Sequence, residues 1–432
     1  MIPRATKRFK FLGKILLLAA SSFLFSRVSY AAGFATDSHS ASALGTSYAG
    51  SVSGANDISD SFFNPAALSN AKKNEALLSM TYINFKVDDD NTSATYNSNG
   101  SSVAGVRNNK QTVNAFIPAG YIASRINDKT TLGLSITSPF GLSTSYNSNW
   151  AGRYYAIDSQ ISSVNFNPMI SYELDKKLSL GFGVQAQYLQ ATLTNAVDIG
   201  GLYLSSPGSS DGFAKVKGDD WGYGFNGGLK YKFNDDLTFG VGYRSAIKHK
   251  LDGDIKLESS AIGNQASNFN AKLTTPENIT AGFSYKLNDK ITLLHDTSWT
   301  RWSRVKSLNI SAQNSNLSNS TNLNFKDSFR YSFGAHFQQS EKLKLKIGAA
   351  YEQGSVGNDS RNPRLPISDK VWTSIGFGYK IGSNTTIDAT YLHEFYKKNK
   401  VDLQAAGSNT TNISANYKNK IDVIAVSLKI DF

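Results

Sequence analysis

Apolar and polar residues alternate along most of the chain, and the alternation continues to its last residue. In the final segment every second residue is large and apolar, and the residues between them are mostly small or charged: Ile424, Val426, Leu428, Ile430 and Phe432. The same pattern recurs in residues 329–337 and 342–352. A period of two residues is typical of β-strands, because successive side chains point to opposite faces of a sheet. The pattern therefore predicts an all-β protein.

The length of the predicted strands favours a membrane barrel over a soluble sandwich. Many strands run beyond ten residues and carry aromatic residues near their ends. A soluble sandwich also alternates, but its strands are usually shorter and its apolar face forms the core. Long strands with an apolar outer face and a polar inner face are typical of a transmembrane β-barrel. After the N-terminal region, no stretch approaches the roughly eighteen continuous apolar residues of a membrane helix.

Short polar segments predict the tight turns of this barrel, since Asn, Asp, Gly and Ser tolerate turn backbones. Six hairpin turns and one further strand at each end, within 76–88 and 412–432, give about fourteen antiparallel strands, an even count that places both termini in the periplasm. Longer polar stretches between the hairpins are expected to form extracellular loops, for example 89–109 and 259–270. The six predicted turns are 126–130, 174–178, 233–237, 287–291, 339–343 and 381–385.

Residues 1–31 have the organisation of a secretory signal peptide. Basic residues precede an apolar run from Ile15 to Phe25, and small residues follow up to Ala31. The run is too short to span a bilayer, and we expect cleavage after Ala31. The alternative is an N-terminal amphipathic anchor. Removal of this segment lowers the formal net charge from +12 to +6, because it holds six basic residues and no acidic ones.

The composition limits the chemistry of the chain. It contains no cysteine, which excludes a disulfide framework, cysteine-ligated zinc and thiol catalysis. Its five histidines are scattered, with no two at a metal-binding spacing, and no Gly-x-Ser-x-Gly motif is present. We therefore expect no enzyme, no metal and no other cofactor; a barrel phospholipase is the enzymatic alternative. The predicted parity turns lysines inward and aromatic residues toward lipid, which does not favour nucleic acid as a partner.

Residues 32–73 lack the alternation and form a small, polar segment ahead of the predicted barrel, residues 74–432. Composition alone allows either a disordered periplasmic tail or a compact plug, called a hatch, inside the barrel. Scattered apolar side chains, Phe34 and Tyr48 among them, favour the plug. A rigid turn is also predicted just before the barrel. This turn consists of Asn64, Pro65 and Ala66.

Several motifs occur in an order that resembles one known family. Ala32-Gly33-Phe34 follows the predicted cleavage site and precedes the Gly/Ser-rich segment and the Asn-Pro-Ala turn. Further motifs are the Trp-Gly-Tyr-Gly sequence within 218–226, the Phe-Lys-Asp sequence within 325–330, the tryptophans Trp299 and Trp302, and Pro366 with Asp369 and Trp372. Their shared order is similar to that of the FadL family of outer-membrane transporters for long-chain fatty acids and other hydrophobic compounds (OmpP1/FadL/TodX type). The likeness covers nearly the whole mature chain.

The resemblance implies a fold and a function. It implies a fourteen-stranded barrel in the cell outer membrane of a Gram-negative bacterium, closed by an N-terminal hatch. Such a barrel binds hydrophobic molecules from outside, here long-chain fatty acids, and releases them sideways through a kinked strand. An apolar tail gains about 0.8 kcal/mol for each CH₂ that leaves water, so an aqueous pore suits it poorly. The alternative is a general porin or an adhesin-like barrel without a specific hydrophobic ligand.

Candidate ligand-binding residues follow from parity and from the resemblance. Lys326 and Arg330 share the inward parity and are the preferred partners of a carboxylate, with Glu352 on the adjacent strand positioned to hold either cation. The resemblance adds Trp372, and it places the Phe34 ring in the binding pocket. The alternatives are solvated lumen charges and a flexible terminal phenylalanine. Four arginines are further candidates that the sequence does not rank: Arg153, Arg244, Arg361 and Arg364.

A kink is predicted in the third strand, after a run from Leu132 to Ser138 whose alternate residues are expected to face lipid. Proline cannot donate a ladder hydrogen bond and glycine weakens a strand, so together they mark a bulge or bend. Alternation resumes at Leu142, which favours an interruption over the end of a strand. A local break in pairing is one way to open a closed wall. The predicted lateral opening consists of Ser138, Pro139, Phe140 and Gly141.

The remaining expectations concern partners. The terminal Phe432 resembles the signature by which the outer-membrane assembly machinery recognises its substrates. We expect a monomer in contact with outer-membrane lipid and lipopolysaccharide, with a long-chain fatty acid or another hydrophobic small molecule as the ligand.

Overall fold

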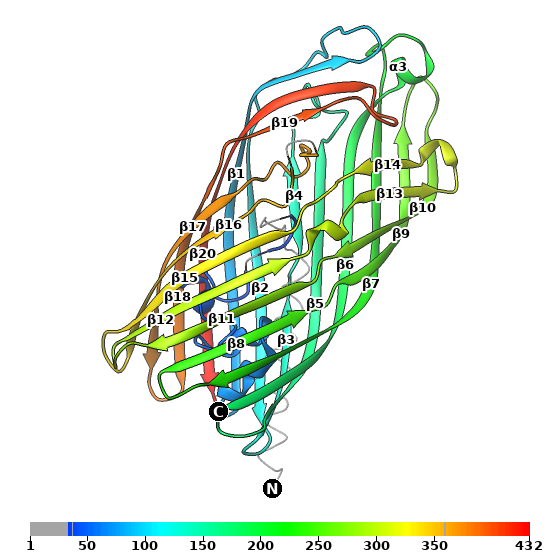
Figure 1. Cartoon of the computed structure of the whole chain (residues 1–432). Coiled ribbons are helices and arrows are strands. Elements are labelled where there is room, and N and C mark those ends of the chain that lie inside the picture. The colour runs from blue at the N-terminus through cyan, green and yellow to red at the C-terminus, as the bar shows by residue number, and fades with distance from the viewer. Residues whose placement is uncertain (1–32, 37, 358–359) are drawn as a thin grey trace.

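The computed structural model describes residues 33–36, 38–357 and 360–432. Within these ranges, twenty strand segments form one sheet, and the last segment pairs with the first along 20 residue pairs to close a barrel (Figure 1). Six of the strands consist of two segments separated by an interruption, so the barrel has fourteen antiparallel strands. The predicted fold is confirmed. The predicted signal peptide lies outside the described residues.

The eight continuous strands are β1 (Glu75–Tyr96), β2 (Lys110–Arg125), β5 (Asp158–Glu173), β6 (Leu178–Asp198), β7 (Asp211–Lys232), β16 (Leu343–Glu352), β17 (Lys370–Ile381) and β20 (Thr411–Asp431). The six interrupted strands are β3 (Thr130–Thr137) with β4 (Gly141–Ser145), β8 (Leu237–Arg244) with β9 (Ile247–Glu258), β10 (Gln265–Thr275) with β11 (Asn278–Lys286), β12 (Ile291–Thr300) with β13 (Ser307–Ala312), β14 (Asn319–Asn322) with β15 (Ser328–Gln338), and β18 (Thr385–Tyr396) with β19 (Asn399–Leu403). The described helices are short: α2 (Ala41–Leu44), α3 (Ile199–Tyr203) and the 3-10 helices η2 (Ile58–Phe62), η3 (Pro65–Asn70), η4 (Trp302–Arg304) and η5 (Ser315–Leu317).

All six predicted turns join consecutive strands, which confirms the hairpin arrangement. In the first turn, the Asn127 side-chain oxygen accepts hydrogen bonds from the backbone N–H groups of Lys129 and Thr130, both at 2.9 Å. Such side-chain-to-backbone bonds are the reason Asn and Asp favour tight turns. At the strand ends away from these turns, the strands are longer than expected, because β1 continues to Tyr96 and β10 begins at Gln265. These polar stretches were predicted as loops. The strands extend into them, whereas residues 97–109 and 259–264 connect strands as predicted.

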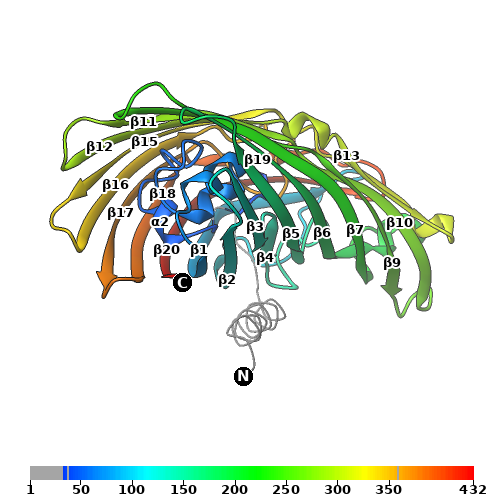
Figure 2. The same cartoon turned by 90° about the horizontal axis from the view of Figure 1, so that it is seen from below.

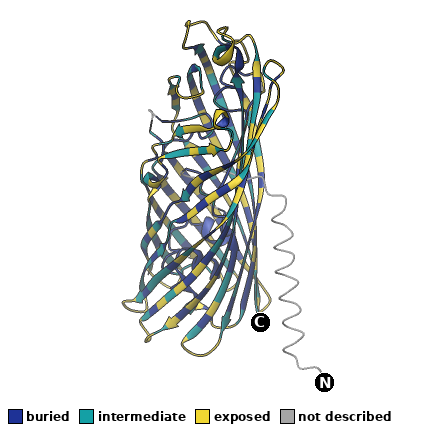
Figure 3. Ribbon diagram, turned by 90° about the vertical axis from the view of Figure 1, so that its right-hand side faces the viewer, coloured by how far each residue is buried: buried dark blue, intermediate teal, exposed yellow. Residues whose placement is uncertain are grey.

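The alternation of the sequence appears as an alternation of exposure along the strands (Figure 3). Phe333, Ile347 and Ile375 are about 60% exposed on the outer face, at 59%, 61% and 62%. Arg330 and Lys346, which have the opposite parity, are buried inside the barrel. A surface with apolar residues outside and charges inside is the inverse of a soluble protein and matches a barrel surrounded by lipid. No described helix is long and apolar enough to cross a membrane.

The segment before β1 folds inside the barrel, as Figures 1 and 2 show in dark blue, and this confirms the predicted plug. The backbones of the hatch and the wall approach closely at a glycine, where no side chain stands between them. A Cβ atom added to Gly242 would lie 1.9 Å from the carbonyl oxygen of Phe63. The Asn64 amide donates to the carbonyls of Val52 in the hatch (2.7 Å) and Leu229 in the wall (2.8 Å). Asn64 also caps η3, so the predicted Asn-Pro-Ala turn fastens the hatch to the barrel.

Candidate functional site

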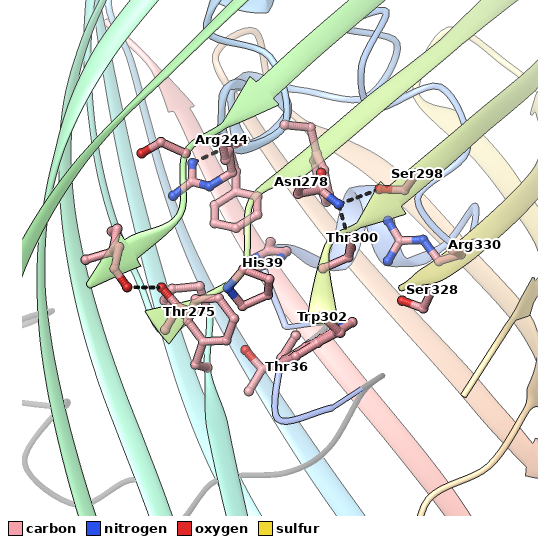
Figure 4. A pocket seen from close by; sticks show the side chains of 18 of the residues that line it. Thr36, His39, Arg244, Thr275, Asn278, Ser298, Thr300, Trp302, Ser328 and Arg330 are labelled. Carbon is pink, nitrogen blue, oxygen red and sulfur yellow. Dashed lines mark hydrogen bonds between the residues drawn. The ribbon is translucent and has the colours of Figure 1, made fainter. Parts of the chain in front are cut away.

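A pocket lies between the hatch and the barrel wall, with about 780 Å³ of space between its side chains, part of it open to solvent (Figure 4). Apolar rings line one part of it, and two arginines reach another. Residues of this lumen pocket include Thr36, His39, Phe62 and Phe63 of the hatch, Pro139 and Phe140 of the predicted kink, and Gln185, Gln187, Arg244, Ile247, Asn278, Trp302, Arg330 and Glu352 of the wall.

Arg244, at the end of β8, is a buried cation of the lumen pocket whose hydrogen bonds go to neutral oxygens. Its guanidinium donates to the Phe62 carbonyl at 2.9 Å, to Asn167 Oδ1 at 3.3 Å and to Gln185 Oε1 at 2.5 Å. It also lies 4.0 Å from the centre of the Phe62 ring. Within the described residues, no carboxylate pairs with it. A buried cation without a counter-ion is costly, and an anionic ligand group would supply one.

Arg330, on β15, is the second cation of the lumen pocket and lies against aromatic rings. Its guanidinium carbon is 5.2 Å from the ring centres of both Tyr48 and Trp372. Glu352, directly opposite Arg330 across the β15–β16 ladder, also lines the pocket, and its carboxylate lies 3.3 Å from the Lys370 ammonium. Aromatic faces attract cations and fix their orientation. This arrangement holds the Arg330 guanidinium at the edge of the pocket.

The structure does not bring every predicted ligand residue into the lumen pocket. Trp372 is fully buried behind Arg330 and supports it rather than lining the pocket. Lys326 is exposed, and its backbone N–H donates to the Ser355 carbonyl at 2.7 Å. The alternation of β15 does not extend to Lys326, because the ladder is interrupted between β14 and β15. The alternation thus predicts correctly that Arg330 and Glu352 point into the barrel. It does not apply to Lys326, which is exposed and does not line the lumen pocket.

Phe34 is buried beside the pocket, between the hatch and the wall. Its ring centre lies 4.9 Å from that of Trp302, edge to face, and 5.7 Å from that of Phe140. Edge-to-face and tilted arrangements are the favourable geometries for aromatic pairs. Gly33 has a φ of +65°, and a Cβ atom there would lie 2.4 Å from the Trp302 ring. The Gly-Phe motif therefore seats the hatch terminus against Trp302, at one side of the pocket.

The wall is interrupted where the kink is predicted. The β2–β3 ladder ends at the pair Gly120–Ile136, and β4 pairs only with β5 among the described strands. The hatch terminus bonds to this interruption from inside: Gly141 N–H donates to the Phe34 carbonyl at 2.7 Å, and Thr36 N–H to the Pro139 carbonyl at 2.9 Å. Part of β2 thus lacks a strand neighbour on one side, next to the lumen pocket.

One detail of the predicted kink is wrong. Leu132 is 44% exposed and faces outward as expected, and Ile136 lies on the same face because the two residues pair with Ile170 and Phe166 of β5, but Ser138 is buried. The Ser138 hydroxyl donates to the Ser163 carbonyl on β5 at 2.7 Å. The chain therefore leaves the lipid-facing parity only at Ser138, beyond the end of β3, where the hydroxyl bonds to the neighbouring strand.

His39 of the hatch lies in the same pocket and was not singled out from the sequence, since it sits in a polar, featureless segment. Its ring stacks on Phe62 with ring centres 3.6 Å apart. Burial and the positive charges of Arg244 and Arg330 lower the pKa of His39 well below its ordinary value. The imidazole is therefore neutral. Among the described residues, no group of His, Asp and Glu is placed to hold a metal ion.

Comparisons with known proteins agree with this arrangement. A family model described as outer membrane protein transport protein (OMPP1/FadL/TodX) matches residues 22–432. The chain is 27% identical to the long-chain fatty acid transport protein of Escherichia coli O6:H1, over 87% of this chain and 90% of that protein. It is 26% identical to outer membrane protein P1 of Haemophilus influenzae, over 96% and 98% of the two chains.

Two solved structures show the same fold. A Pseudomonas aeruginosa FadL homologue superposes with a TM-score of 0.87 at 24% identity, over 93% of this chain and 100% of that one. The Pseudomonas putida toluene transporter TodX superposes with a TM-score of 0.69 at 16% identity, over 92% and 99%. The chain belongs to the OmpP1/FadL/TodX family and is an outer-membrane transporter of hydrophobic compounds.

Proposed function

We propose that this transporter takes up long-chain fatty acids. The observation that carries the proposal is the pair of buried arginines beside apolar rings in one pocket. Arg244, whose hydrogen bonds in the described structure go to neutral oxygens, offers charge-assisted hydrogen bonds to a carboxylate. Arg330 faces the same pocket, and Phe62, Phe140 and Trp302 offer apolar surface for the tail. The relative from Escherichia coli is described as a long-chain fatty acid transport protein.

The proposed exit is sideways, through the interruption between β3 and β4. A ligand in the lumen pocket would contact Pro139 and Phe140, which line the pocket and belong to this interruption. The end of the hatch is bonded to the same residues, so movement of Phe34 away from the wall would free the break in the ladder. In this proposal Phe34 couples occupancy of the pocket to opening of the wall.

Ligand binding tests the first part of the proposal. Purified protein is extracted without fatty-acyl detergent, and the molecules that co-purify in the lumen are identified by mass spectrometry. We expect a carboxylate-headed occupant, and we expect the Arg244→Met variant to bind oleate about tenfold more weakly, because it loses charge-assisted hydrogen bonds. Arg125, a partly exposed arginine at the end of β2 that does not line the lumen pocket, provides the control substitution Arg125→Met.

Other outcomes would replace this proposal. Occupancy by neutral hydrocarbons alone, with equal oleate affinity in wild type and Arg244→Met, would support a hydrocarbon transporter. High ion conductance in planar bilayers without a saturable ligand would support a general pore.

Uptake tests the exit. Replacing Pro139 and Gly141 by Val and Thr restores residues that favour a regular strand. We expect the folded barrel to form, seen as heat-modifiable migration on gels, but labelled oleate should no longer enter cells. Unchanged uptake by this variant would exclude the lateral exit. Deleting residues 32–34 and measuring oleate affinity then separates a ligand-contacting Phe34 from a terminal residue without a role.

A further inference from the structure

The hatch contributes one polar side chain to the lumen pocket that the proposed function leaves without a task. His39 is 4% exposed, and its Nδ1 atom is buried without a hydrogen-bond partner within the described structure. Buried polar atoms are nearly always hydrogen-bonded, so an unpaired ring nitrogen needs an explanation. Figure 4 shows the ring among the labelled side chains of the pocket.

The surroundings of His39 hold its ring in place without using that nitrogen. The ring stacks on Phe62 and lies edge to face with Phe63, with ring centres 5.5 Å apart in the second case. The backbone N–H of His39 donates to the Tyr48 hydroxyl at 3.3 Å, and its carbonyl accepts from the Tyr121 hydroxyl at 3.1 Å. The imidazole is therefore fixed by packing and by the hydrogen bonds of its own backbone, while Nδ1 has no hydrogen-bond partner within the described structure.

We infer that His39 is the residue with which the hatch contacts the polar head group of the ligand. Arg244 and Arg330 hold that head group from the barrel wall, and His39 hydrogen-bonds to it from the hatch. A neutral imidazole carries one N–H donor and one acceptor, so it can donate to a carboxylate or accept from a hydroxyl. This inference rests on the proposed binding of a ligand in the lumen pocket.

His39 also connects the head group to the proposed exit. His39 lies only three positions after Thr36, whose backbone N–H donates to the Pro139 carbonyl at the interrupted strand. A hydrogen bond from the ligand to His39 thus acts on the start of the hatch, and this part of the hatch also bonds to the interruption between β3 and β4. A pure hydrocarbon has no group for this contact. The hatch therefore distinguishes ligands with a polar head from those without one.

The experiment compares two ligands that share a tail, oleate and octadecene, in the full-length protein. His39→Phe keeps an aromatic ring to stack on Phe62 and removes both nitrogens, whereas His39→Gln restores a hydrogen-bonding group. We expect His39→Phe to weaken oleate binding about tenfold and to leave octadecene binding within about twofold, with His39→Gln close to wild type for oleate. His336 is another buried histidine of the barrel and does not line the lumen pocket, so His336→Phe is the matched control.

Each outcome decides between the inference and its rivals. Equal weakening of oleate and octadecene in His39→Phe would mean that His39 only packs, and unchanged oleate binding would mean that it does not contact the head group. Either result overturns the inference and leaves the proposed function standing. If wild-type protein binds neither ligand, the proposed function fails as well. Heat-modifiable migration on gels confirms that each variant is folded.

Discussion

Lys346, on the inner face of β16, joins three parts of the molecule. Its ammonium lies 2.6 Å from Asp388 Oδ1 on β18 and 2.5 Å from the Ser42 hydroxyl in the hatch. Both charged side chains are buried, with 3% and 7% of their surface exposed. An ion pair of this kind adds little to stability compared with apolar residues of the same volume, but removing one partner leaves the other charge buried and unpaired.

This asymmetry gives a prediction for a double-mutant cycle. Lys346→Met should lower the free energy of unfolding by about 3–5 kcal/mol, and Lys346→Met with Asp388→Leu should recover most of that loss. The measurement is unfolding of the detergent-solubilised barrel in urea, followed by tryptophan fluorescence. Additive losses in the double variant would mean that the two side chains do not act as a pair.

At this scale the sequence allowed some residues to be placed and not others. Arg330 and Glu352 could be placed because each lies within an uninterrupted segment, where parity is strict. Lys326 could not, because the strand is interrupted just before β15 and its parity is lost there. Arg244 was one of four equivalent arginines, and His39 lies in a segment with no periodicity. Their roles depend on contacts between the hatch and distant strands, which no local pattern records.

At the scale of elements, the interrupted β3–β4 strand and the hatch terminus form one unit. The residues Ala35 and Phe140 make an isolated antiparallel bridge between them. Antiparallel partners have Cα atoms about 4.5–5.5 Å apart, within the range that a disulfide spans. The natural chain has no cysteine, so an engineered pair has no competing thiol.

A disulfide at this bridge tests whether the hatch must separate from the wall. In the double variant Ala35→Cys with Phe140→Cys, an oxidant added to the cells forms the disulfide. These cells should then take up labelled oleate no faster than cells lacking the protein. Addition of a reducing agent should restore uptake, because it frees the hatch terminus. The two single variants show the effect of losing each side chain alone. Equal uptake before and after reduction of a fully formed disulfide would contradict the coupling.

The strands and turns themselves could be predicted almost completely. Alternation and the Asn/Asp turns are local signals, and lipid strengthens them by requiring an apolar outer face over the whole circumference. The interruption at Pro139 was predictable for the same reason, since proline acts on its own backbone. The other five interrupted strands were not predicted. Among them only that between β10 and β11 contains a proline, Pro276, in the interrupting residues.

At the scale of the whole molecule, the hatch occupies part of the interior of the barrel and packs against its wall. Close backbone contacts, rather than large side chains, form much of the seal, as at Gly242 against Phe63. A methyl group at Gly242 would overlap the Phe63 carbonyl, and backbone atoms cannot move aside as a flexible side chain can. The seal therefore depends on the absence of a side chain at this position.

Gly242→Ala should consequently raise the ion conductance of the barrel in planar bilayers while the barrel itself still forms. Gly227→Ala is the matched control in the adjacent strand β7, because a Cβ atom there meets only the Gly181 carbonyl at an ordinary 3.5 Å. Its conductance should equal that of wild type. The same low conductance in all three proteins would show that the hatch tolerates the displacement or that it seals elsewhere.

The hatch forms a hydrogen bond at the place where the first and last strands of the barrel meet, and this has a consequence for assembly. In the hatch, the Ala41 N–H donates to the Ser427 hydroxyl on β20 at 2.9 Å, and that hydroxyl donates to Ser79 on β1 at 2.9 Å. These partners are 386 and 348 positions apart along the chain. Contacts at such separations form late, because the whole intervening chain must be positioned first. The contact of the hatch with β1 and β20 should therefore form as the barrel closes, and a chain deprived of its hatch should spend longer as an open, unjoined sheet.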